Sequence, residues 1–136
     1  MRRFILILLL MSCQISFAQV FNFSNSGQEN ANEIMFNYIQ EKIQAPIHDV
    51  IAYFYDIDND NEEEIIGIVK NKHFYSLAGY NLVILKKQDD DYQNIQTDIY
   101  FDDTKPLEID NKKITYYKSV FYKHKKYSAK YNNNNE

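Results

Sequence analysis

The sequence is poor in the residues that cross-link or interrupt a chain. Among its 136 residues there are one cysteine, no tryptophan, three glycines and two prolines. A single cysteine excludes a disulfide within the chain, so an apolar core must hold any fold. The low glycine and proline content excludes collagen-like and linker-like sequences. No apolar run approaches the roughly 20 residues that a membrane-spanning helix needs.

The composition is that of one small folded domain. Apolar residues make up 45% of the chain and charged residues 25%, with 12 tyrosines and 9 phenylalanines. Such proportions separate globular proteins from disordered ones. A chain of this length buries enough surface for one core and no more.

The first 18 residues have the features of a secretory signal peptide. Arg2 and Arg3 precede an apolar run over residues 4–11, and the small residues Ser16 and Ala18 stand three and one positions before Gln19. We therefore predict cleavage after Ala18 and export to the periplasm or the extracellular space. The mature chain would carry 13 lysines against 19 acids, a net charge of −6.

Cys13 leaves a second interpretation of this segment open. The residues Leu10-Met11-Ser12-Cys13 resemble a loose bacterial lipobox, in which the cysteine would carry a lipid and anchor the protein to a membrane surface. Met11 departs from the small residue usual at its position. Contact with a membrane is expected only in this alternative.

The mature chain shows first a helical and then a strand pattern. The spacing predicts one amphipathic helix over residues 28–44, which Pro46 cannot continue. Strands are predicted at 50–57, 65–69, 80–85 and 94–101, followed by a hairpin of 107–109 with 114–122. Because residues 50–57 are apolar on both faces, we expect a central strand there, with Tyr53, Phe54 and Tyr55 in the core.

The predicted fold class is therefore α+β. One N-terminal helix packs on an antiparallel meander of about five to six strands, because the connections between the strands are short. The domain covers residues 19–131, and the asparagine-rich residues 132–136 form a disordered tail.

Charge is divided unevenly along the mature chain. Residues 19–111 contain 6 lysines and 18 acids, whereas residues 112–136 contain 7 lysines and one acid. The lysine-rich terminal strand could lie beside the acidic hairpins. Alternatively, it forms an aromatic and basic binding surface from Tyr116, Tyr117, Tyr122, Tyr127 and Tyr131. Nucleic acid is not an expected partner for an exported chain of net charge −6.

One segment carries a recognisable chemical pattern. Acids alternate along the loop between the first two strands, at Asp56, Asp58, Asp60, Glu62 and Glu64. Alternate side chains of a tight loop can converge on a hard cation, and Ca²⁺ takes six to eight such oxygen ligands. We expect Glu62 to bind through its carbonyl and the other four through their side chains. The other interpretation is a solvated turn that prevents edge pairing.

The loop is not an EF-hand, because Gly67 stands where a bidentate glutamate is required and a strand follows instead of a helix. It resembles the Asp-x-Asp-x-Asp-Gly-x-x-Asp/Glu calcium hairpins of FG-GAP and VCBS repeats, with Asn61 in place of the glycine. It is also similar, over residues 53–87, to small exported bacterial proteins with one such loop. Most members of that group are uncharacterised, and similar domains serve as inhibitors or immunity proteins.

No catalytic constellation is recognisable. The mature chain lacks cysteine, a Gly-x-Ser-x-Gly elbow and a glycine-rich phosphate loop, and His48, His73 and His124 stand singly. We therefore expect no enzyme activity. The leading interpretation is a noncatalytic cell-envelope protein, an inhibitor or immunity protein against a basic envelope or toxin hydrolase. The alternative is a calcium-binding structural domain without a dedicated protein partner.

Overall fold

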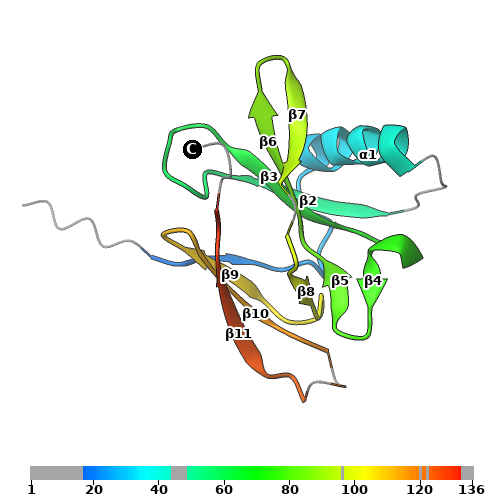
Figure 1. The fold of residues 1–136 in the computed structure, drawn as a ribbon, viewed down its shortest axis with the longest axis vertical. Helices are drawn as coiled ribbons and strands as arrows, with labels where there is room; N and C mark the ends of the chain where they lie inside the picture. Colours follow the sequence, from blue (N-terminus) through cyan, green and yellow to red (C-terminus); the bar gives the residue numbers. More distant parts are fainter. Residues whose placement is uncertain (1–16, 44–48, 96, 120, 122, 133–136) are drawn as a thin grey trace, which may run out of the picture.

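The computed structural model describes residues 17–43, 49–95, 97–119, 121 and 123–132 (Figure 1). This part of the chain forms one α-helix and eleven strands in three antiparallel sheets, which confirms the α+β class and exceeds the predicted strand count. The elements are β1 (Gln19–Phe21), α1 (Glu29–Ile43), β2 (Val50–Tyr55), β3 (Glu64–Val69), the 3₁₀ turn η1 (Lys72–Phe74), β4 (Tyr75–Ser76), β5 (Gly79–Asn81), β6 (Val83–Gln88), β7 (Asp91–Ile95), β8 (Tyr100–Phe101), β9 (Leu107–Asp110), β10 (Lys113–Tyr117) and β11 (Lys126–Lys130).

The sheet β2-β3-β6-β7 is the middle layer of the molecule. Helix α1 covers one face of it, and the sheet β1-β9-β10-β11 lies against the other, while β4-β5-β8 forms the third sheet (Figure 1). All six residues of β3 are buried. Ile65 and Val69 pack toward the helix, and Ile66 and Ile68 pack toward the second sheet, because strand side chains alternate between faces.

The prediction that residues 50–57 form the central strand is wrong. β2 is an edge strand, and β3 and β6 are the strands with a neighbour on each side. In β2 only Ala52 is buried, and Tyr53, Phe54 and Tyr55 are half-buried. The two faces of β2 are apolar for separate reasons: Phe54 packs beside α1, and Tyr53 packs against the rings of Phe21 and Phe23.

Two side chains at the start of α1 bond to the open edge of β2. The Asn32 side-chain oxygen accepts from Ala52 N at 2.6 Å, and the Gln28 side-chain oxygen accepts from Phe54 N at 2.7 Å. Gln28 N in turn donates to Ala52 O at 2.8 Å. Ala52 N, Ala52 O and Phe54 N are therefore satisfied on this edge without a neighbouring strand.

Several predicted strands are divided or extended in the structure. The predicted strand 80–85 is split at Leu82 between β5 and β6, and 94–101 is split between β7 and β8. The predicted hairpin is present as β9 and β10, and Asn111 and Lys112 turn the chain with φ values of 46° and 65°. The lysine-rich terminal segment forms β11, which pairs with β10.

The predicted aromatic and basic surface is only partly present. Tyr116 and Tyr131 are buried in the core. Tyr117 and Tyr127 are half-buried beneath the ammonium groups of Lys126 and Lys118, at 6.0 and 4.5 Å from the ring centres. Tyr122 lies outside the described residues.

Most of the residues at the two ends of the chain lie outside the described residues. Cys13 and residues 133–136 of the predicted tail are not among the described residues, and β1 begins at Gln19. No helix among the described residues is long and apolar enough to cross a membrane.

Candidate metal centre

The acidic loop is folded by its own side chains. Tyr55 pairs with Glu64, so the ends of β2 and β3 hold residues 56–63 in a closed turn. The Asp56 carboxylate accepts from Asp60 N at 3.1 Å and from Asn61 N at 2.9 Å. Asn61 has a φ of 68°, a left-handed conformation that asparagine tolerates better than most residues. The substitution for glycine in the calcium-hairpin pattern is therefore compatible with the turn.

Glu64 lies completely inside the protein, at the first position of the central strand. Its Oε2 accepts from Ile57 N at 2.9 Å. Burial raises the pKa of the Glu64 carboxyl, although the Ile57 amide and Lys86 both favour its charged form. A buried carboxylate of this kind needs a cation close by.

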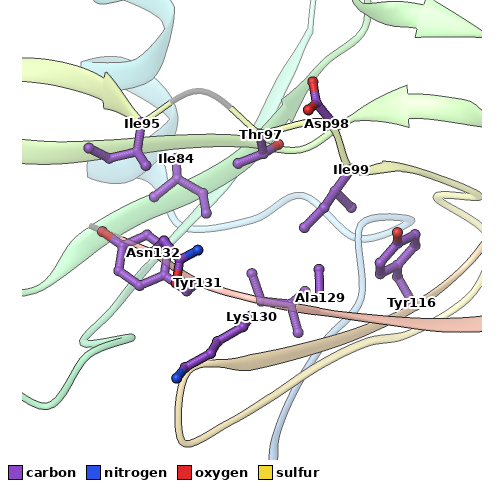
Figure 2. A pocket seen from close by; sticks show the side chains of 11 residues that line it. Ile84, Ile95, Thr97, Asp98, Ile99, Tyr116, Ala129, Lys130, Tyr131 and Asn132 are labelled. Atoms are coloured by element: carbon purple, nitrogen blue, oxygen red, sulfur yellow. The ribbon is translucent and has the colours of Figure 1, made fainter. Parts of the chain in front are cut away.

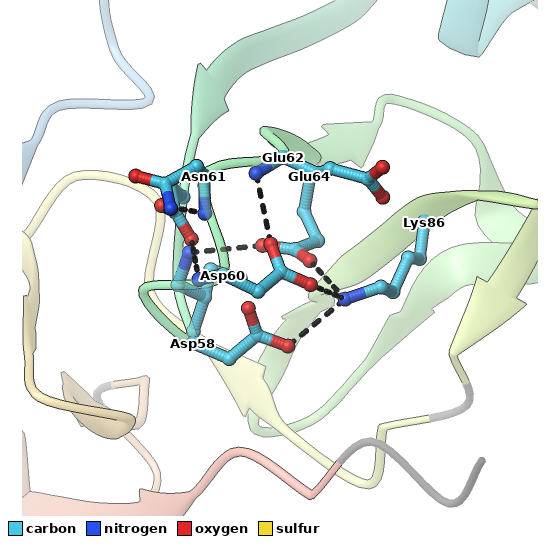
Figure 3. A network of polar contacts seen from close by, with 8 residues as sticks. Asp58, Asp60, Asn61, Glu62, Glu64 and Lys86 are labelled. Carbon is cyan, nitrogen blue, oxygen red and sulfur yellow. Dashed lines mark hydrogen bonds and ion pairs between the residues drawn. The ribbon is translucent and has the colours of Figure 1, made fainter.

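Lys86 supplies one positive charge. Since Ile65 pairs with Leu85, the next residue of β6 lies beside the loop. Figure 3 shows its ammonium among three carboxylates: Nζ is 2.7 Å from Asp60 Oδ2, 2.9 Å from Asp58 Oδ2 and 3.0 Å from Glu64 Oε1. Burial acts to lower the pKa of Lys86, but the three carboxylates outweigh it and raise the pKa well above its ordinary value. The hydrogen bond from Lys86 lowers the pKa of Asp60.

Three of the five predicted ligands come together in a geometry that could hold a metal ion. Asp56, Asp58 and Glu64 each offer one carboxylate oxygen, and these atoms lie within 4.8 Å of one another. Two oxygens that bind one Ca²⁺ at about 2.4 Å lie no more than about 4.8 Å apart, so these separations are compatible with a shared ion. Asp60 stands beside this group with its oxygens turned to Lys86 and to Glu62 N, and Glu62 is exposed.

Several buried polar atoms have no hydrogen-bond partner. Asp58 Oδ1, Glu64 Oε1 and the Tyr131 hydroxyl are buried and have no hydrogen-bond partner among the described residues, and Glu64 Oε1 has only its ion pair with Lys86. Burial raises the pKa of the Tyr131 hydroxyl, and the charges of Glu64, Asp58 and Asp60 raise it further. Buried polar atoms normally have a partner, so unpaired ones indicate a bound water or ion.

Lys86 was not predicted to belong to this site, and Tyr131 was not predicted to be buried. Lys86 follows an apolar strand, and only the pairing of β3 with β6 places it at the loop. Tyr131 follows β11 at the far end of the chain, where its lysine-rich surroundings suggest a surface position.

A cavity of about 280 Å³ lies between β6, β7, β10 and the segment from β11 onward (Figure 2). The exposed Asp98 and Lys130 are among its lining residues, together with Tyr116 and Tyr131. Four isoleucines complete the apolar lining: Ile84, Ile95, Ile99 and Ile114. Tyr131 thus belongs to the wall of this cavity.

The histidines do not gather into a site among the described residues. His73 is exposed in η1, and His124 Nδ1 lies 3.2 Å from Asp102 Oδ2. His48 lies outside the described residues. The cluster of Asp56, Asp58 and Glu64 is the one group of potential metal ligands found in this part of the chain.

Comparison of the chain with protein-family models, with curated proteins and with solved structures finds no match. The resemblance of the acidic loop to FG-GAP and VCBS calcium hairpins therefore stays a prediction from its residues. Any functional argument must start from the geometry of the site.

Proposed function

We propose that this protein is an exported, noncatalytic binding domain whose acidic loop takes up one Ca²⁺ ion. The observation that carries the proposal is the convergence of three carboxylate oxygens with buried, unpaired polar atoms at one point. Of the two functions predicted from the sequence, this geometry favours the calcium-binding domain.

The charges of the cluster support a divalent ion. Asp56, Asp58, Asp60 and Glu64 bring four negative charges, and Lys86 compensates one of them. Glu64 is completely buried, and the Asp58 side chain is 8% exposed, so water screens this excess poorly. A divalent cation would reduce the net charge of the cluster from −3 to −1.

The ligand chemistry favours Ca²⁺ over other ions. All the available side-chain ligands are oxygens, and an irregular loop suits the flexible coordination of Ca²⁺ better than the strict octahedron of Mg²⁺. Lys86 competes for the same oxygens, so we expect a dissociation constant on the order of 10⁻⁴ to 10⁻³ M, the range of extracellular modules. At millimolar calcium this contributes about 0.4 to 1.4 kcal/mol of stability.

Calorimetric titration and thermal melts test the proposal. We expect one-to-one binding of Ca²⁺, weaker binding of Mg²⁺, and a higher melting temperature with Ca²⁺ than with chelator. Asp58→Asn should abolish the response. Asp90→Asn is the matched control, because it removes the same charge from the exposed turn between β6 and β7. Equal melts with Ca²⁺ and chelator, or an equal loss in both variants, would contradict the proposal.

A second candidate function rests on the position of the exposed acids. The loop 56–63 and the turn between β6 and β7 leave the same end of the middle sheet, because β3 begins where β6 runs outward. Six exposed acids therefore stand at this end: Asp60, Glu62, Glu63, Asp89, Asp90 and Asp91. Such an end suits a basic partner, whose association it would accelerate by electrostatic steering.

This second candidate is the inhibitor or immunity protein of a basic cell-wall hydrolase. The test is a turbidity assay of cell-wall digestion by such an enzyme, with wild type and the double variant Glu62→Lys, Glu63→Lys. Wild type should slow digestion at low salt, and the double variant should not. If the double variant still slows digestion, the acidic end of the sheet is not the surface that contacts the hydrolase.

A further inference from the structure

Two segments with exposed apolar side chains meet at one end of the molecule. Ser119, which follows β10, donates from its backbone N to Ala78 O at 2.9 Å and from its hydroxyl to Leu77 O. The turn between β4 and β5 and the end of β10 therefore lie side by side (Figure 1). Leu77 in this turn is 65% exposed, and Phe121, two residues beyond Ser119, is 79% exposed. Large apolar side chains so far out of the core indicate a contact surface.

Positive charge accompanies these two side chains. Both come from stretches of the sequence without any acidic residue, 65–88 and 111–135. Directly after Phe121 the chain carries three exposed lysines, Lys123, Lys125 and Lys126. Leu77, Phe121 and these three lysines are here called the basic end.

The acids that border the basic end are already paired. Asp102 N donates to Tyr117 O at 2.8 Å, which places the turn after β8 beside the end of β10. The Asp102 carboxylate lies 3.2 Å from His124 Nδ1, and Asp103 forms an ion pair with Lys70. Within the described part of the chain, the exposed lysines of the basic end form no ion pair. Their charge is therefore available to a partner.

The exposed acids stand at other places in the molecule. They lie in the loop 56–63 and in the turn between β6 and β7. Figure 1 shows these two at the left and the top, away from the turn between β4 and β5 at the lower right. The chain has a net charge of −4, yet it presents a positive end. An anionic surface would attract this end and repel the acidic loop, and so it would orient the molecule.

The combination of groups favours a lipid surface over a protein partner. Attachment to a membrane surface takes apolar side chains that enter the boundary between headgroups and acyl chains, together with lysines that attract anionic lipids. Leu77 and Phe121 supply the first and the neighbouring lysines the second. A protein partner would instead need a broader surface of matched shape.

We propose that the basic end binds the surface of an anionic membrane. Leu77 and Phe121 enter the headgroup region, and the lysines contact the lipid phosphates. This attachment is reversible, and it is separate from the lipid that Cys13 would carry in the lipobox interpretation. It leaves the acidic loop turned away from the membrane. The inference does not depend on the calcium site.

Co-sedimentation with lipid vesicles tests the proposal. One set of vesicles contains phosphatidylcholine alone, and the other contains equal parts of phosphatidylcholine and phosphatidylglycerol. Chelator is present throughout, so that calcium cannot link the acidic loop to the lipid phosphates. Wild type should sediment with the anionic vesicles and much less with the neutral ones. Added salt should weaken the binding, because it screens the lysines.

Two double variants separate the apolar from the ionic contribution. Leu77→Ser with Phe121→Ser should lower the affinity for anionic vesicles about tenfold or more, because both side chains lose their place in the bilayer. Lys123→Glu with Lys125→Glu should lower it at least about fivefold for each lysine. All four residues are exposed, so the variants should melt as wild type does.

Matched controls change the same chemistry elsewhere on the surface. Val20→Ser removes an apolar side chain that is 54% exposed in β1. Lys42→Glu with Lys87→Glu reverses two exposed charges, one in α1 and one in β6. Both controls should bind anionic vesicles as wild type does.

Fluorescence locates the contact directly, because the chain contains no tryptophan. The emission of Phe121→Trp should shift to shorter wavelength when anionic vesicles are added, since the indole leaves water. The emission of Val20→Trp should not shift.

Several outcomes would overturn the proposal. Wild type that stays in solution with anionic vesicles refutes it, and so does equal binding to both kinds of vesicle. The same holds if the controls lose as much affinity as the variants of the basic end. If wild type instead self-associates, and Lys123→Glu with Lys125→Glu abolishes this, the basic end contacts a second copy of the chain and not a lipid. None of these results bears on calcium binding by the acidic loop.

Discussion

Replacing Lys86 by methionine perturbs the acidic site most directly, because it removes the ammonium that contacts three of its carboxylates. The Lys86 side chain is 13% exposed and reaches the carboxylates of Asp58 and Glu64, which are 8% and 0% exposed. Removing one partner of a buried ion pair typically costs about 3 to 5 kcal/mol, because the remaining charge is left uncompensated. We therefore expect Lys86→Met to lower the free energy of unfolding by about this amount in chelator.

Calcium should reverse much of this loss. In the variant the ion no longer competes with an ammonium for the oxygens of Asp58 and Glu64. We expect its affinity to rise about tenfold or more, since each 1.4 kcal/mol of competition removed is a factor of ten. Stability and affinity should thus change in opposite directions, a result that a general loss of packing would not produce.

Urea denaturation in chelator and in millimolar Ca²⁺, together with calorimetric titration, measures both effects. Lys87→Met is the matched control, because Lys87 is the exposed neighbour on the same strand. The reasoning is refuted if Lys86→Met costs less than about 1 kcal/mol in chelator, since surface ion pairs contribute no more than this. It is refuted equally if the variant and wild type respond identically to calcium.

Three further predictions concern the core and the N-terminus. Gly67→Ala should cost about 1 to 3 kcal/mol in a denaturant titration, because the added Cβ would stand 2.6 Å from Met35 Sδ and 2.7 Å from Ile51 O. Ile66→Ala, at a fully buried position, should cost about 2 to 5 kcal/mol, and Phe54→Ala less, because Phe54 is half-buried; the reverse order would contradict the edge position of β2. Intact-mass measurement of the exported protein should find Gln19 as the first residue, and a lipid-modified Cys13 would contradict this.

The elements that local pattern determines could be predicted from the sequence. The helix, the strand at 65–69 and the β9–β10 hairpin depend on periodicity and on turn residues, and the structure contains all three. The edge position of β2 could not be predicted, because apolar residues on both faces of a strand are equally compatible with a central strand. What makes β2 an edge is the pairing order and the side chains of Gln28 and Asn32.

The candidate site, too, could be predicted only in part from the sequence. Its carboxylates lie within nine consecutive residues, so their spacing alone predicted a cation site. The structure brings together fewer ligands than predicted: Asp56, Asp58 and Glu64 converge, whereas Asp60 contacts Lys86. Lys86 reaches the site only through the pairing of β3 with β6, strands that are distant in the sequence from the loop's own spacing pattern. No short-range pattern in the sequence contains that information.

The hydrogen bonds that join Asn32 of α1 and Gln28, directly before it, to the edge of β2 affect association between molecules. An uncovered strand edge is a template on which another chain can add a strand. Here the side chains of Gln28 and Asn32 occupy that template, so access to it depends on the helix staying in place. Local opening requires less free energy than global unfolding, and a helix can detach while the sheet persists. Detachment of α1 would therefore expose the unpaired backbone groups of β2 on an otherwise folded molecule. We expect aggregation to begin below the temperature at which the sheet melts.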